Sequence, residues 1–107
     1  MTPRRFAAAG AIALVAAGMA GAADFTVVQK NREFSVAEIE VRVGDRIVFF
    51  NIDSVTHNVY SETKGAEFEI ELQPPGRSDS VRFSNPGPVD VSCAIHPSMR
   101  LREHVKL

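Results

Sequence analysis

The sequence has little of what several common protein classes require. Its 107 residues include one cysteine, one tyrosine and no tryptophan. A single cysteine cannot close an internal disulfide, so its thiol is left for an intermolecular bridge, a reaction or a metal. The net charge is −1, with no basic stripe to support nucleic-acid binding. No stretch has a helical period of useful length, and no segment repeats, so a helical bundle or a repeat array is not indicated.

Residues 1–23 are predicted to be a secretory signal peptide. Arg4 and Arg5 precede an apolar run over 6–20, and the small residues of 20–23 fit cleavage after either Ala22 or Ala23. The apolar run is short for a membrane span, and the alternative is a retained N-terminal anchor. Two arginines fit both an ordinary signal and a twin-arginine signal, so the export route stays open. We therefore predict a periplasmic domain over 24–107 with no membrane span after cleavage.

Alternation of apolar and polar residues predicts short strands throughout this domain. In one of them Phe68, Ile70 and Leu72 are expected to face the core, with glutamates between them on the solvated side. Prolines and glycines in 73–77 and 85–88 mark turns, because they cannot continue a central strand. The spacing predicts an all-β sandwich or barrel. The expected strands are 25–29, 39–43, 47–50, 57–60, 68–72, 78–84, 89–93 and 101–107.

The segment from Cys93 to Met99 concentrates possible metal ligands. Cys93, His96 and Met99 supply a thiolate, an imidazole and a thioether within seven residues. Thiolate and thioether are soft ligands that suit copper, and imidazole binds copper in either oxidation state. A second imidazole would complete a set of two histidines and one cysteine with a weak axial methionine, which is typical of blue-copper electron-transfer sites.

His57 is the candidate for that second imidazole. It lies between two predicted strands, where a sandwich could bring it to the Cys93 loop. The alternatives are a surface or core histidine for His57, an inert buried thiol for Cys93 and a core side chain for Met99. His104, in the last predicted strand, is expected to be a solvated side chain rather than a ligand.

Several motifs together resemble the cupredoxins, a family of small blue copper proteins. The similarity runs from Phe34 to Leu107 and is greatest to the amicyanin, pseudoazurin and plastocyanin branch; the two residues between His96 and Met99 match the amicyanin loop length. The chain departs from the pattern at Val36, where many relatives have proline, and at Arg100-Leu101, where Lys-Gly is frequent. The motifs are Val41-x-x-Gly44-Asp45, Phe50-Asn51-x-Asp53, His57-Asn58-Val59, Pro86-Gly87 and Cys93-x-x-His96-Pro97-x-Met99.

The resemblance implies a Greek-key β-sandwich of about seven or eight strands and a specific site. His57, Cys93 and His96 would bind one copper ion in a plane, with Met99 as the axial ligand. Asn58 would tie the two ligand loops together by hydrogen bonds. The edge of the His96 ring would reach the surface in an apolar docking patch of Ile95, Pro97 and Pro88.

The function implied by this resemblance is exported electron transfer rather than enzymatic catalysis. A monomer would carry one electron between redox proteins, with an amine dehydrogenase as donor and a c-type cytochrome as acceptor. One alternative is a periplasmic chaperone or sensor that handles copper, although such proteins favour methionine-rich or paired-cysteine ligands. Another is a copper enzyme, which would need several more histidines than the three present.

Overall fold

The structure is a computed structural model that describes residues 21–107. The predicted signal peptide therefore lies outside the described residues except for 21–23. Within the described residues there is no helix long and apolar enough to cross a membrane.

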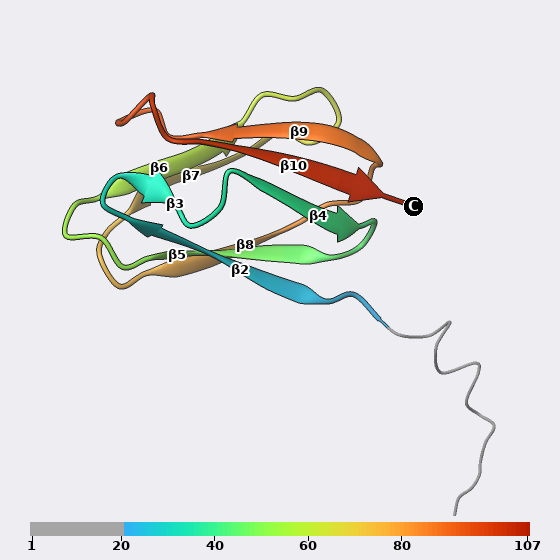
Figure 1. The fold of residues 1–107 in the computed structure, drawn as a ribbon, viewed down its shortest axis with the longest axis horizontal. Coiled ribbons are helices and arrows are strands. Elements are labelled where there is room, and N and C mark those ends of the chain that lie inside the picture. The colour runs from blue at the N-terminus through green and yellow to red at the C-terminus, as the bar shows by residue number, and fades with distance from the viewer. Residues whose placement is uncertain (1–20) are drawn as a thin grey trace, which may run out of the picture.

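Within residues 21–107, nine strands form two sheets packed face to face, which confirms the predicted all-β Greek-key sandwich (Figure 1). One sheet has the order β4-β10-β9-β6-β7 and the other the order β3-β2-β5-β8. Most neighbours are antiparallel, but β10 runs parallel to β4 and β2 parallel to β5. The strands are β2 (Asp24–Lys30), β3 (Glu33–Phe34), β4 (Glu38–Arg42), β5 (Arg46–Asn51), β6 (His57–Ser61), β7 (Phe68–Gln73), β8 (Ser78–Arg82), β9 (Gly87–Ser92) and β10 (Arg100–Lys106).

All eight predicted strands are present, and β3 is a ninth that the sequence analysis missed. It contains two residues only, paired with the end of β2 across a tight turn. Asn31 and Arg32 in that turn have φ of 54° and 58°, a conformation in which asparagine is several-fold enriched. A two-residue strand is too short to show an alternation, so no period could indicate it.

The core lies between the sheets and is built from alternate residues of each strand. Phe49 lies at its centre, with its ring centroid 6.2 Å from that of Phe34 and 5.9 Å from that of Phe68. Phe68 in turn meets Phe83 at 5.9 Å. The contacts of Phe68 with Phe49 and Phe83 cross from one sheet to the other, whereas Phe34 and Phe49 lie in the same sheet. The crossing contacts fix the two sheets against each other in a chain that lacks tryptophan.

The prediction that Leu72 faces the core is wrong. Its side chain is 66% exposed, whereas the next residue, Gln73, is fully buried. The pairing of β6 with β7 shifts between His57↔Gln73 and Val59↔Ile70, so β7 carries one extra residue there. A bulge of this kind reverses which residues face inward. The exposed glutamates of β7 agree with the prediction.

Candidate metal centre

Two loops at one end of the sandwich bring the predicted ligands together. β6 begins with His57, and β9 ends at Ser92, immediately before Cys93. The loop that follows Cys93 lies at the opposite end of the molecule from the C-terminus of β10 (Figure 1). The backbone N–H of Met99 donates to the carbonyl of His96 at 2.9 Å, which closes this loop into a tight turn.

Three donor atoms face one another at this end. His57 Nδ1 lies 3.7 Å from Cys93 Sγ and 3.2 Å from His96 Nδ1, and Cys93 Sγ lies 4.0 Å from His96 Nδ1. A point at the centre of a triangle with these sides is about 2.1 Å from each atom, close to the metal–nitrogen and metal–sulfur distances of first-row ions. The cluster therefore has the size of a metal site.

Burial differs among the predicted ligands. His57 is fully buried, and Cys93 and Met99 are each 1% exposed. His96 is only half-buried. The first three side chains are therefore screened from water, and the imidazole of His96 is the part of the cluster that reaches the surface. The role of Met99 as an axial ligand stays a prediction.

A carboxylate holds the far side of the His57 ring. Asp53 Oδ2 lies 3.0 Å from His57 Nε2, the nitrogen that does not face Cys93. Asp53 also accepts hydrogen bonds from the backbone N–H groups of Arg32 and Ser54. The Arg32 bond, followed by the His57 bond, lowers the pKa of Asp53 to about 2. An ionised Asp53 fixes the Nε2–H tautomer, which leaves Nδ1 free to bind a metal.

Asp53 was not among the predicted site residues. Its position in Phe50-Asn51-x-Asp53, four residues before His57, was the available signal. Sequence alone did not show that this side chain turns back onto the histidine ring, because residues four apart in an irregular loop have no fixed relative orientation.

Asn58 joins the two loops. Its backbone N–H donates to Cys93 Sγ at 3.4 Å, and its side-chain oxygen accepts from the backbone N–H of Ala94 at 3.2 Å. Its amide nitrogen donates to Glu69 Oε2 at 3.1 Å and to the carbonyl of Glu71 at 3.3 Å. One buried side chain thus fixes the thiolate loop against β6 and β7.

The remaining predicted residues fall into two groups. Ile95 is 49% exposed and Pro97 is also exposed, both next to His96 in the chain. Pro88 cannot border His96, because it lies near the start of β9, opposite His104 of β10, and the metal loop follows the other end of β9. His104 is outside the cluster and bonds to Glu38 at 3.1 Å. Its side chain is 39% exposed, in agreement with a solvated position.

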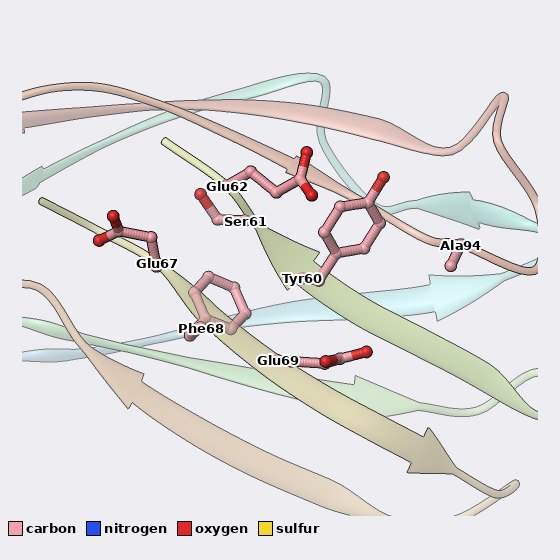
Figure 2. A pocket seen from close by; sticks show the side chains of 7 residues that line it. All are labelled: Tyr60, Ser61, Glu62, Glu67, Phe68, Glu69 and Ala94. Atoms are coloured by element: carbon pink, nitrogen blue, oxygen red, sulfur yellow. The ribbon is translucent and has the colours of Figure 1, made fainter. Parts of the chain in front are cut away.

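A shallow groove lies on the sheet beside the metal loop. Tyr60 and Phe68 form its floor, and Ala94 lies at one end. The carboxylates of Glu62, Glu67 and Glu69 surround them (Figure 2). None of the four predicted ligands lines the groove, so the metal cluster is a separate feature.

The sandwich and its buried cluster of one cysteine and two histidines define a copper-binding protein of the cupredoxin class. The chain belongs to the plastocyanin/azurin family of copper-binding proteins, whose family model matches residues 21–107. The cluster of His57, Cys93 and His96 fits the type 1 copper site of that family.

Two relatives come from Methylorubrum extorquens. The chain is 31% identical to amicyanin-alpha over 96 residues, which cover 87% of this chain and 79% of the relative. It is 32% identical to methylamine utilization protein MauL over 93 residues, which cover 85% of this chain and 82% of the relative.

Solved structures share the fold. A reduced amicyanin mutant has a TM-score of 0.72 at 26% identity and covers 80% of this chain and 83% of its own. A copper-containing nitrite reductase from Thermus scotoductus SA-01 has a TM-score of 0.73 at 23% identity. That match covers 78% of this chain but only 22% of the reductase, so it shows the fold of one part of a larger protein.

Proposed function

We propose that this protein carries single electrons between redox proteins by cycling one bound copper ion between Cu(II) and Cu(I). The observation that carries this proposal is the triangle of Cys93 Sγ and the two histidine Nδ1 atoms, with sides of 3.2, 3.7 and 4.0 Å. His57, Cys93 and His96 would hold the copper, with Met99 as a weak axial ligand.

The support around the ligands suits electron transfer. Asp53 fixes the ring of His57, and Asn58 fixes Cys93 and the start of its loop. Ligands held in this way change position little when the copper changes its charge. A small rearrangement lowers the barrier to electron transfer, and the half-buried His96 provides the route to a partner.

Copper handling by a chaperone or sensor is the alternative, and burial argues against it. A protein that releases Cu(I) to a partner needs ligands that the partner can reach. Here three of the four proposed ligands are at most 1% exposed. The bond from Asp53 to His57 further holds one of them in place.

We propose that the protein is not an enzyme. Among residues 21–107 there is a single cluster of at least three potential metal ligands. The one histidine outside this cluster bonds to Glu38 on an outer strand. A copper enzyme of the nitrite reductase type would need a second copper site, for which this chain lacks the histidines.

The proposed partners are an amine dehydrogenase as donor and a c-type cytochrome as acceptor, with docking at Ile95 and Pro97. The relative MauL is a methylamine utilization protein, which supports an amine-oxidising context for this chain. We further propose a periplasmic, monomeric protein, since residues 1–23 have the pattern of an export signal.

The absorption spectrum of the copper-loaded domain tests this proposal. Thiolate-to-Cu(II) charge transfer should make the oxidised protein intensely blue, and reduction should bleach it. Copper should stay bound on reduction in the presence of a Cu(I) chelator. A colourless Cu(II) protein would contradict the proposed site, and release of copper on reduction would favour copper handling.

A further inference from the structure

One buried acid is not used by the proposed site. Glu103 of β10 is fully buried, and neither carboxyl oxygen has a hydrogen-bond partner among the described residues. It shares the inward face of β10 with Leu101 and Val105. A buried carboxylate without a partner is costly, because burial removes the water that would stabilise its charge.

No cation within residues 21–107 pairs with this carboxyl group. In the register Glu103 lies between Ile39 of β4 and Val89 of β9, and the neighbouring inward residues of those strands are Val41 and Val91. Gln29 of β2 is another fully buried polar side chain, and it bonds to Gln73. Phe34 is the buried residue of β3, which contacts β10.

The charged groups of these elements are on the outer faces or at the ends of the strands. Arg102 pairs with Asp90 and His104 with Glu38, both on the surface. The others are exposed or half-buried: Asp24, Lys30, Glu33, Glu40, Arg42, Arg46, Arg100 and Lys106. Without a facing cation, burial raises the pKa of Glu103 to about 8.

The strand that carries Glu103 begins beside the metal loop. Met99, Leu101 and Glu103 are alternate buried residues, so their side chains lie on the same side of the chain. At about 3.3 Å per residue, Glu103 is about 13 Å along the strand from Met99. The intervening interior is apolar, and charges interact more strongly there than through water.

We propose that Glu103 is a proton site coupled to the copper: it takes up a proton when Cu(II) is reduced and releases it when Cu(I) is oxidised. The donor protein supplies the electron that reduces Cu(II) to Cu(I). Solvent supplies the proton that forms the O–H bond on the Glu103 carboxylate. No other bond forms or breaks. Cu(II) carries one more positive charge than Cu(I), so the oxidised site favours the ionised carboxylate.

This inference rests on the proposed electron-transfer function. At about 13 Å and an effective dielectric constant of about 20, the change of charge at the copper should alter the protonation equilibrium of Glu103 about tenfold. The charge of Glu103 should alter the reduction equilibrium of the copper by the same factor. The reduction potential should therefore fall with rising pH near the pKa of Glu103, by about 59 mV in total for a one-electron couple. By thermodynamic linkage, oxidation of the copper should lower the proton affinity of Glu103 by the same factor.

Voltammetry across the pKa of Glu103 tests the coupling. In wild type the reduction potential should fall as the pH rises through about 8. Glu103→Gln and Glu103→Val should not show it, and both keep the core filled. Glu40→Gln removes an exposed carboxylate from β4 and should behave as wild type. Equal pH dependence in wild type and Glu103→Gln, or none in wild type, would overturn the proposal.

Metal-free protein tests the buried acid independently of the copper. Between the ordinary pKa of 4.5 and about 8, folded protein binds a proton that unfolded protein releases. The folding equilibrium constant should thus fall as much as tenfold for each pH unit of rise. An infrared band of a protonated carboxyl should persist at pH 6 in wild type and be absent in Glu103→Gln. Loss of the blue site with this band intact would refute the proposed function alone. Absence of the band in wild type would refute the buried proton site.

Discussion

Cys93 is the residue on which the proposed chemistry depends most. Its sulfur lies between two imidazole nitrogens, is 1% exposed and accepts a hydrogen bond from the backbone of Asn58. A thiolate is the ligand that makes a Cu(II) site blue, and the hydrogen bond tunes its basicity. The histidines supply affinity, whereas the cysteine supplies the electronic character of the site.

Replacing Cys93 with serine should abolish the blue absorption and weaken copper binding. The domain should stay folded, because serine is close in size to cysteine. Cys93 also lies at the metal end of the core, just after β9, so most core contacts do not involve it. Visible absorption and circular dichroism of the copper-treated variant measure the two effects. His104→Ala removes a histidine outside the cluster and should leave the spectrum and the potential unchanged. A blue Cys93→Ser protein would refute the proposed ligand.

Replacing Asp53 with asparagine should weaken copper binding by about ten- to a hundredfold, as is usual when a carboxylate behind a ligating histidine is lost. The single asparagine oxygen can still accept one of the two backbone bonds, which in wild type go to different carboxylate oxygens, but it carries no charge to fix the His57 tautomer. Competition with a chelator measures the affinity. Asp90→Asn removes an exposed carboxylate paired with Arg102 and serves as the control. Equal affinities for the two variants would contradict the positioning role.

At the scale of the elements, the bulge in β7 decides which residues form the core. It places Gln73 inside, where its amide bonds to the carbonyl of Phe49 and its oxygen accepts from Gln29. Gln73 is also opposite His57 in the register. The bulge therefore exposes one leucine and places a hydrogen-bonding side chain at the metal end of the core.

A pair of leucine substitutions tests this register. Leu72→Ala should change the free energy of unfolding by less than about 0.5 kcal/mol, since the side chain is largely exposed. Leu101→Ala should cost about 2–5 kcal/mol, because it leaves a cavity beside the metal loop. Urea denaturation of the metal-free protein measures both. Similar losses would show that Leu72 is packed as the alternation predicted.

For the whole molecule, the end opposite the metal site is closed by Asp45. Its carboxylate accepts from the backbone N–H groups of Ala23 and Arg42, at 2.8 and 2.7 Å. Gly44, with φ of 95°, makes the turn that places it there. These bonds join the start of β2 to the turn between β4 and β5, which explains the Gly-Asp pair in the motif.

Acid should destabilise the domain in part through Asp45. The Ala23 and Arg42 bonds lower its pKa below the ordinary value of 3.8. Unfolded protein then takes up a proton that folded protein does not, so this stability is present above pH 3.8 and is lost as the pH falls below it. Asp45→Asn should be less stable than wild type at neutral pH and lose less stability on acidification. Thermal unfolding from neutral to acidic pH measures this, and parallel profiles would contradict it.

The mature N-terminus offers a further prediction. The sequence allows cleavage after Ala22 or Ala23. The predicted signal peptide of residues 1–23 corresponds to cleavage after Ala23, but the hydrogen bond from the backbone of Ala23 to Asp45 leads us to propose cleavage after Ala22. Ala23 is then the first residue, and its ammonium group would replace the amide that bonds to Asp45. A charged donor strengthens such a bond. Mass spectrometry of exported protein should find a chain that begins at Ala23. A chain that begins at Asp24 or later would refute the proposal.

The sequence alone determined the fold class and the main ligand candidates. Period-two alternation is local, so eight of nine strands could be predicted from it, and the ligand types of Cys93, His96 and Met99 follow from their chemistry. Tertiary structure alone decided the bulge that exposes Leu72, the contact of Asp53 with His57 and the burial of Glu103. The bulge and the burial of Glu103 depend on how strands align, and strand register is set by packing across the sandwich rather than by any local pattern. The contact of Asp53 with His57 depends on the path of the irregular loop between β5 and β6, which no periodicity indicates.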